Sequence, residues 1–171
     1  MLQEPLTLSK LIILYMLNQI DFPISITQVS DFILDREYTN FWTLHQAIGE
    51  LIDTGMLSRR MINSKPHIII TEEGVHTLYY FDNRIDTSIK QDIVSYLREH
   101  KMNLRNKIAV QSNYYKSTSG EYEARLVAKE KDITLVDITL SVPTEDTAAA
   151  ICDNWRDKNE TIYQYLTQEL F

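Results

Sequence analysis

Polar side chains that can form hydrogen bonds recur at three-residue steps between residues 40 and 46. Asn40, Thr43 and Gln46 share one face of a helical period, and His45 lies on the flank of that face. Amide and hydroxyl groups can bond base edges or phosphates, and a glutamine can pair bidentately with adenine. The pattern therefore favours contact with nucleic acid over its simplest alternative, an ordinary polar helix face.

A basic cluster follows at Arg59, Arg60, Lys65 and His67, with Asn63 between its halves. It is the only basic cluster in the first 81 residues. Long cations on a hairpin suit phosphates or the walls of a narrow minor groove. The alternative is a solvated hairpin whose charges bind nothing. We expect the residues of both groups to contact DNA.

The elements that must position these groups lie between residues 39 and 74. Apolar residues at three- and four-residue steps predict a helix with one buried face, made of Phe41, Leu44, Ile48, Leu51 and Ile52. Thr39 or Asn40 can cap its start, and Gly55 can end it in a left-handed conformation. Trp42 lies on the shoulder of the helix, where we expect it to pack against the protein.

A hairpin and a further helix are predicted directly after Gly55. Residues 56–62 and 67–70 read as strands, and residues 63–66 read as the turn between them. Thr71 and two following carboxylates mark the start of the next helix. This order of helix, strand, strand and helix is that of a winged helix-turn-helix. Any small hairpin after any buried helix is the alternative.

The flanking segments complete the expected first domain. Helices are predicted at about 6–20 and 28–37, the second capped by Thr27, with a short strand at 24–26 before it. A helix to about residue 83 should bury Val75, Leu78, Tyr79 and Phe81, and a longer helix should run from about 86 to 101. The last two helices carry more apolar surface than one winged helix needs, which suggests a subunit or domain contact.

From residue 108 the hydrophobic period changes from 3.6 to 2 residues. Three antiparallel strands are expected at about 108–116, 121–130 and 133–142, followed by helices at about 145–157 and 160–170. The predicted fold class is α+β: a winged helix-turn-helix followed by a βββαα module with a three-stranded meander. The expected domains are 1–83 for DNA binding, 84–107 as a connecting helix, and 108–171 for dimerisation or an effector.

Composition limits the function classes. The chain carries 17 Lys and Arg against 24 Asp and Glu, for a net charge of −7. Residues 1–81 hold 5 basic and 9 acidic side chains, so DNA binding would depend on a local positive patch. A single cysteine, Cys152, rules out an internal disulfide, and no apolar run is long enough to span a membrane. We expect a cytoplasmic protein.

Nothing in the sequence predicts catalysis. The four histidines, at positions 45, 67, 76 and 100, have no spacing typical of a metal site. With only 4 glycines, the chain has no Gly-rich phosphate loop. We therefore expect no enzymatic activity, no cofactor and no metal.

Two motifs carry a resemblance to known proteins. The run Ile70-Thr71-Glu72-Glu73-Gly74 resembles the wing closure of winged-helix regulators of the PadR and MarR superfamily, and residues 51–57 resemble the exit from their recognition helix. Over its length the chain is similar to an uncharacterised bacterial domain family of predicted winged-helix regulators. That similarity rests on residues 11–15, 21–23 and 38–40.

The resemblance implies a DNA-binding transcriptional regulator, with its third helix in the major groove and its wing on the backbone or in the minor groove. Paired winged helices read two half-sites, so we expect a homodimer. The C-terminal module would pair subunits, sense a small-molecule effector or recruit a protein partner. Relatives carry Arg or Lys on the outer face of this helix, where the chain has Glu50 and Asp53. A winged helix that binds a protein instead of DNA is the alternative, and the acidic balance favours it.

Overall fold

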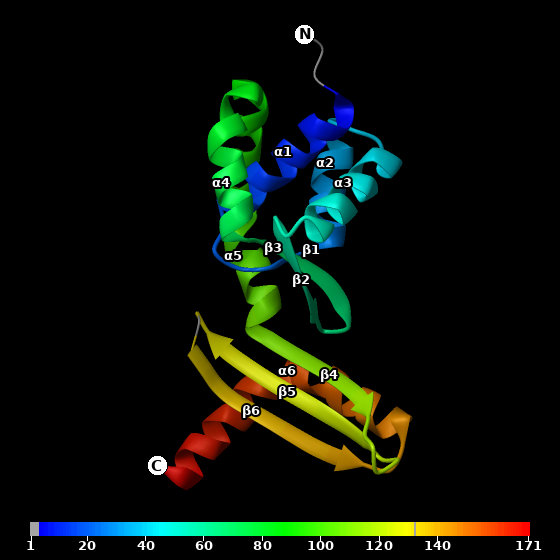
Figure 1. The fold of residues 1–171 in the computed structure, drawn as a ribbon. Coiled ribbons are helices and arrows are strands. Elements are labelled where there is room, and N and C mark those ends of the chain that lie inside the picture. The colour runs from blue at the N-terminus through cyan, green and yellow to red at the C-terminus, as the bar shows by residue number, and fades with distance from the viewer. Residues whose placement is uncertain (1–3, 132) are drawn as a thin grey trace. The chain divides into compact units, whose positions relative to one another are not determined.

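The described residues form two separate three-stranded antiparallel sheets and seven helical segments, which gives a mixed α+β fold (Figure 1). The computed structural model describes residues 4–131 and 133–171. The chain divides into two compact units, one comprising residues up to 61 together with 65–104, and the other comprising 62–64 together with 105–171. Each unit has its own sheet.

The first unit is built around α1 (Pro5–Asn18), most of whose apolar side chains are buried. Packed near it are α2 (Ile26–Asp35), α3 (Phe41–Asp53) and α4 (Glu72–Phe81), followed by the 3₁₀ turn η1 (Asp82–Arg84) and α5 (Thr87–Ala109). The sheet joins β1 (Ile24–Ser25), β2 (Leu57–Ile62) and β3 (Lys65–Ile70) in the order β1-β3-β2. β3 is therefore the central strand.

Side-chain caps set where the helices begin. Asn40 accepts a bond of 2.9 Å from the backbone N–H of Thr43, as one of the two predicted caps of α3. The predicted cap of α2 was wrong: Ser25, not Thr27, accepts from the N–H of Gln28. The Gln28 side chain in turn accepts from the Ser25 N–H, which closes a capping box, and the helix begins at Ile26, two residues earlier than predicted.

The junction between β3 and α4 explains the Ile-Thr-x-x-Gly motif. The Thr71 hydroxyl donates to the carbonyl of Gly55 at 2.6 Å, and the Thr71 N–H donates to the carbonyl of Met56 at 3.1 Å. The same hydroxyl caps α4 by accepting from Gly74 N–H. A Cβ on Gly74 would lie 2.3 Å from the Met56 carbonyl oxygen, so only glycine fits there. The motif fastens the start of α4 to the start of β2.

The predicted buried face of α4 was partly wrong. Gly74 and Leu78 are buried, whereas Val75 is 40% exposed and Tyr79 is 82% exposed. Residues 74 and 78 are one helical turn apart, and the adjacent row at 75 and 79 is rotated away from them. Phe41 at the start of α3 is likewise 51% exposed, because the helix meets the core only from Leu44 onward.

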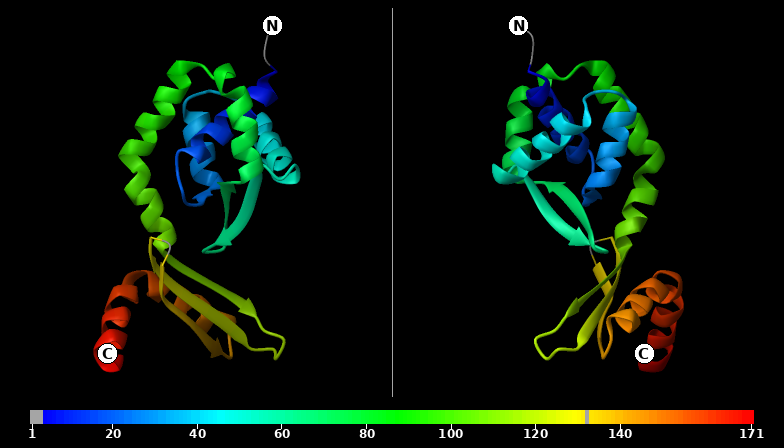
Figure 2. Two further views of the ribbon diagram at one scale, coloured as in Figure 1. Left: turned by 60° about the vertical axis from the view of Figure 1, so that its left-hand side comes forward. Right: turned by 90° about the vertical axis from the view of Figure 1, so that its right-hand side faces the viewer.

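The second unit is a sheet in the order β4-β5-β6 with one helix against it. Its strands are β4 (Val110–Lys116), β5 (Tyr122–Glu130) and β6 (Ile133–Val142), and its helix is α6 (Glu145–Leu170). The views of Figures 1 and 2 agree that α6 lies on one face of the sheet. The core between them consists of Ala124, Leu126, Ala128, Ala148, Cys152 and Trp155.

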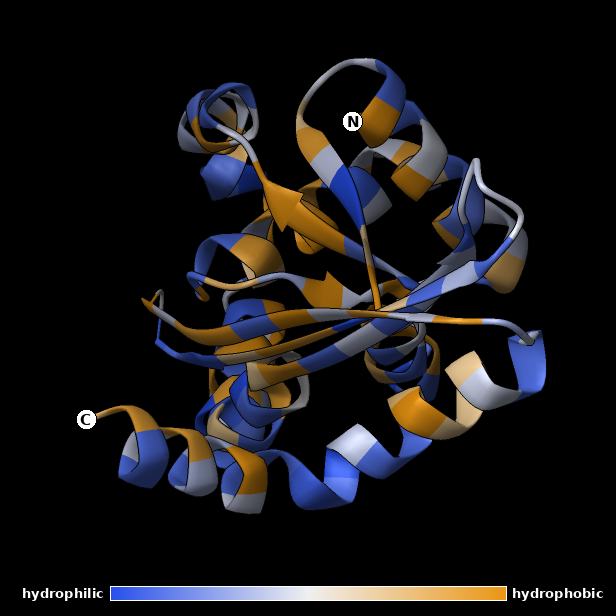
Figure 3. Ribbon diagram, turned by 90° about the horizontal axis from the view of Figure 1, so that it is seen from below, coloured by the Kyte–Doolittle hydropathy of each residue, from blue (hydrophilic) through white to orange (hydrophobic). Residues whose placement is uncertain are grey.

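Three antiparallel strands were correctly predicted, but the helices after them were not. Residues 145–170 form one continuous helix instead of two, because no glycine or proline interrupts the segment around Asp157 to Asn159. Towards the C-terminus this helix shows alternating hydrophobic and hydrophilic residues (Figure 3). The first strand begins at Val110 instead of residue 108, since α5 continues to Ala109.

Within the part of the chain that the structure describes, no helix is both long enough and apolar enough to cross a membrane.

Candidate nucleic-acid interface

The polar residues predicted on the outward face of α3 differ in exposure and in hydrogen bonding. His45 and Gln46 are exposed, Thr43 is half-buried, and Asn40 is exposed but uses its side-chain oxygen as the helix cap. Asn40 therefore keeps its amide NH₂ and one lone pair of its oxygen for a ligand. Gln46 and Thr43 remain the groups on this face best placed to bond a base edge.

Gln46 belongs to a chain of polar contacts that runs across two helices. Its Nε2 donates to Oε1 of Glu50 at 2.9 Å, and Lys10 of α1 lies 2.5 Å from Oε2 of the same carboxylate. Lys10, and then Gln46, hold the pKa of Glu50 below its usual value. The Glu50 charge, which lies where relatives carry Arg or Lys, is thus matched by a cation. The contact also orients the Gln46 amide.

An aromatic group occupies the first turn of α3. Trp42 is 80% exposed, so the prediction that it packs against the protein was wrong. Its ring contacts Phe41 edge to face at a centroid distance of 5.5 Å, and Phe41 lies 4.2 Å from the ring of His45. Together these residues form an exposed aromatic surface beside Gln46. Periodicity missed it because the helix start projects beyond the core.

The hairpin β2–β3 displays three cations. The side chains of Arg59, Arg60 and Lys65 are exposed and make no hydrogen bond or ion pair with any residue that the structure describes. Arg59 and Arg60 are consecutive in a strand, so they lie on its opposite faces. Only residues 54–56 separate α3 from β2, which keeps the cations close to the polar helix in sequence.

Two predicted contact residues are not available on this surface. His67 is only 6% exposed, and its Nδ1 lies 2.9 Å from the carbonyl oxygen of Lys65. Asn63 donates to the Val110 carbonyl at 3.1 Å and accepts from the Ser112 N–H. Both residues were predicted to contact DNA, but the His67 side chain lies in the interior and the Asn63 side chain bonds the edge of β4.

The turn at the hairpin tip is also shorter than predicted. Asn63 and Ser64 have φ values of 53° and 61°, which make a two-residue turn of the kind that matches strand twist. Lys65 and Pro66 then belong to β3 instead of the turn. Asn63 is the signal that could have located this turn, because asparagine tolerates a positive φ, whereas Ser64 carries no such signal.

A long-range cluster that sequence reasoning missed joins α2 to α5. Asp92 accepts from the Tyr38 hydroxyl and from Nη1 of Arg36, the latter at 2.7 Å. Burial, and then the bond to Asp92, raise the pKa of Tyr38 to about 12. The ring of Tyr96 lies 4.4 Å from that of Phe32. These contacts hold α5 against the helix that precedes α3.

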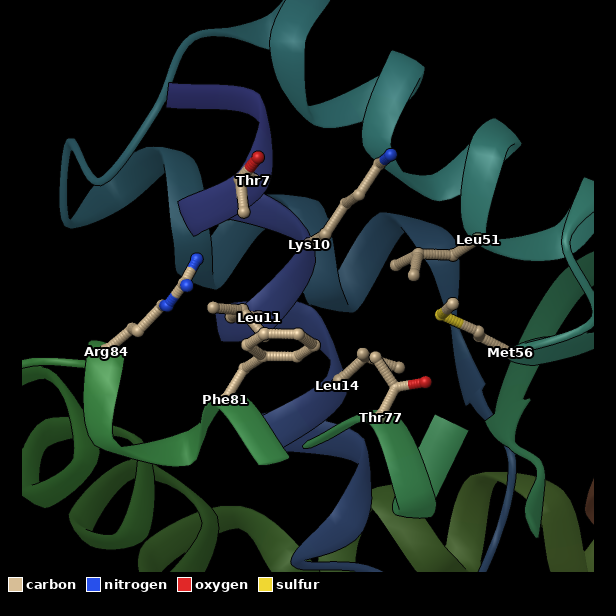
Figure 4. A pocket seen from close by; sticks show the side chains of 9 residues that line it. All are labelled: Thr7, Lys10, Leu11, Leu14, Leu51, Met56, Thr77, Phe81 and Arg84. Carbon is tan, nitrogen blue, oxygen red and sulfur yellow. The ribbon is translucent and has the colours of Figure 1, made fainter. Parts of the chain in front are cut away.

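A small cavity opens between α1, the end of α3 and α4 (Figure 4). Its volume is about 140 Å³, and it is lined mainly by apolar side chains, among them Leu11, Leu14 and Phe81. Lys10 and Arg84 also line it, and the Arg84 guanidinium lies 4.8 Å from the Phe81 ring centre. Lys10 is already paired with Glu50, so Arg84 is the cation left to meet a ligand there.

Metal-binding side chains do not gather in this protein: within residues 4–131 and 133–171, no group of three or more His, Cys, Asp or Glu could hold an ion.

Comparison with known proteins gives one family. Neither a curated protein nor a solved structure matches the sequence. The family model described as "domain of unknown function (DUF4364)" matches residues 9–170, which is nearly the whole chain. The chain therefore belongs to the DUF4364 family.

Proposed function

We propose that the N-terminal part of the chain, residues 1–83, is a winged helix that binds duplex DNA and regulates transcription. In this proposal α3 enters the major groove, and the β2–β3 hairpin is the wing that contacts phosphates or the minor groove. The order of three helices and a hairpin supports it, as does the resemblance of residues 70–74 to the wing closure of PadR and MarR regulators.

The observation that carries the proposal is that the hairpin cations are exposed and unpaired among the described residues. In the same unit, Lys10, Arg36 and Lys90 are each paired with a carboxylate, whereas Arg98 and Lys101 of α5 are exposed and have no carboxylate partner among the described residues. Arg59, Arg60 and Lys65 have no such partner among the described residues, although the chain has more acids than bases. Unpaired, exposed cations grouped on one hairpin of an acidic protein support local binding of phosphate, and because Arg59 and Arg60 lie on opposite faces of β2, they would reach different phosphates.

The helix would supply the sequence preference. Gln46 and Thr43 can bond base edges, while the exposed ring of Trp42 can contact a thymine methyl group. Glu50, already paired with Lys10, contributes less repulsion than its charge suggests. The wing would set the affinity and the helix would set the choice of site, because phosphate contacts carry no sequence information directly.

A second candidate function is binding of a protein partner through the same helix. The observation in its favour is the exposed aromatic pair, Trp42 at 80% and Phe41 at 51%. Aromatic side chains are enriched at the centres of protein interfaces. The two functions differ in what the hairpin cations do, since a protein partner on α3 has no general need of them.

The test compares matched variants on DNA fragments selected from the source genome. Arg60→Ala should weaken preferred and random duplexes about equally, while Gln46→Ala should cost about 1–3 kcal/mol on the preferred site and little on random DNA. Arg156→Ala removes the same charge from an exposed position of α6 and should leave binding unchanged. Absence of any bound fragment at low salt would reject DNA binding in favour of a protein partner.

A further inference from the structure

The two edges of the second sheet differ. β5 is the central strand, so β4 and β6 are the edges of the sheet. The outer edge of β4 is occupied, because the Asn63 side chain bonds the Val110 carbonyl and the Ser112 N–H, and Ser64 N–H donates to the Asn113 side chain. β6 pairs with β5 alone among the strands that the structure describes. Its outer backbone groups face no strand.

β6 also lacks the features that usually prevent an edge strand from pairing. It is the longest strand, spanning Ile133–Val142, and contains no Lys, Arg or Pro. Its one charged residue, Asp137, forms a two-point ion pair with Arg125 of β5, with N–O distances of 3.1 and 2.7 Å. The edge therefore presents no uncompensated charge to a partner.

A β-bulge limits the regular part of this edge. The register with β5 shifts between Ala128 and Lys129, which leaves Leu135 unpaired and residues 136–142 in regular pairing. On the face that α6 covers, Val136, Ile138 and Val142 pack against the core, yet Leu140 on the same face is 43% exposed. Apolar surface thus remains beside the open edge.

We propose that β6 pairs antiparallel with β6 of a second copy of this chain, across a two-fold axis at Thr139, to form a continuous six-stranded sheet. This register matches the regular segment 136–142 with itself. It places Val136 opposite Val142 and Ile138 opposite Leu140 on the face that α6 covers, and it covers the exposed Leu140. On the other face Thr139 meets Thr139, and Asp137 meets Ser141, so no like charges oppose each other.

The second copy is the occupant that the sequence of the edge fits best. An isologous pair needs a strand that is complementary to itself, and the two faces of residues 136–142 satisfy this in one register. The inference concerns subunit pairing and does not depend on DNA binding. Its test is therefore made in the absence of DNA.

Sedimentation at micromolar concentration should give about twice the chain mass of 20.0 kDa. Thr139→Glu places two carboxylates together at the axis, whereas within one subunit the new carboxylate faces Arg125, its cross-strand neighbour. It should raise the dimer dissociation constant about tenfold or more without loss of folding, because like charges apposed across an interface repel. Thr161→Glu, the same change on exposed α6, should leave the dimer intact.

Cross-linking tests the register separately. Oxidised Thr139→Cys should form a covalent dimer, and oxidised Ser141→Cys should not, because residue 141 lies opposite residue 137 of the other copy. The native Cys152 is only 6% exposed and does not compete. A monomer at micromolar concentration, a dimer that Thr139→Glu leaves unchanged, or a cross-link at residue 141 without one at residue 139 would each overturn the proposal.

Discussion

At the scale of single residues, the contacts with the most exact requirements lie where β3 meets α4. Thr71 bonds the backbone of Gly55 and Met56, and Gly74 leaves room for the Met56 carbonyl. The sequence motif predicted that a helix starts here, because a hydroxyl before two carboxylates is a local signal. It could not predict the close approach of the Met56 carbonyl to Gly74, because that contact forms only when the end of β3 lies beside the start of β2.

Replacement of Gly74 tests this packing. Gly74→Ala should destabilise the protein by about 2 kcal/mol or more, because the new methyl group would overlap a backbone oxygen that cannot move freely. Gly49→Ala is the matched control: a Cβ there meets nothing within 4 Å, so it should stabilise α3 by about 0.5–1 kcal/mol. Chemical denaturation of both variants measures the difference. Equal effects of the two substitutions would contradict the account of the motif.

At the scale of elements, local sequence signals predicted most helices and strands, whereas the contacts between distant segments were not predicted. The helix periods, the Asn40 cap and the alternation of residues 124, 126 and 128 are all set within a few residues, and the structure has them. The predicted break in α6 was wrong because charged residues such as Asp157 do not end a helix. The contact between Tyr38 and Asp92 spans 54 residues of sequence, so no local pattern predicts it.

The stabilisation that the contacts between α2 and α5 provide should depend on pH in the alkaline range. The pKa of Tyr38 rises from its ordinary value of 10.0 to about 12 in the folded chain, so the protonated hydroxyl is the form that folding favours. Its contribution to stability is fully present below pH 10 and is lost as the pH rises from 10 towards 12.

Tyr38→Phe isolates this contribution from that of the other tyrosines. At pH 8 the variant should be less stable by about 1–2 kcal/mol, because the Asp92 carboxylate loses one of its two donors and keeps only Arg36. The difference in free energy of unfolding between the variant and the wild type should become smaller above pH 10. Urea unfolding at pH 8, 10 and 11 measures it, and a gap that stays constant would show that the Tyr38 proton does not stabilise the junction.

At the scale of the whole molecule, the proposed DNA binding depends on the arrangement of charge more than on the net charge. The net charge of −7 argues against DNA binding when it is considered alone. Among the described residues, Glu50, Asp92 and Asp137 are each paired with a cation, while the cations of the hairpin are not paired. Composition could not predict which charges pair, because pairing depends on which helices and strands come together.

The most direct test of DNA binding is the salt dependence of duplex affinity. If the hairpin cations Arg59, Arg60 and Lys65 contact phosphates in a dimer, the logarithm of the binding constant should fall with the logarithm of salt concentration with a slope of about −3 to −6. Arg60→Ala should flatten that slope by about one unit per subunit. A slope near zero, or no change on replacing Arg60, would contradict the proposal by showing that the hairpin does not lie on DNA, and it would leave the exposed aromatic residues of α3 as the candidate surface for a protein partner.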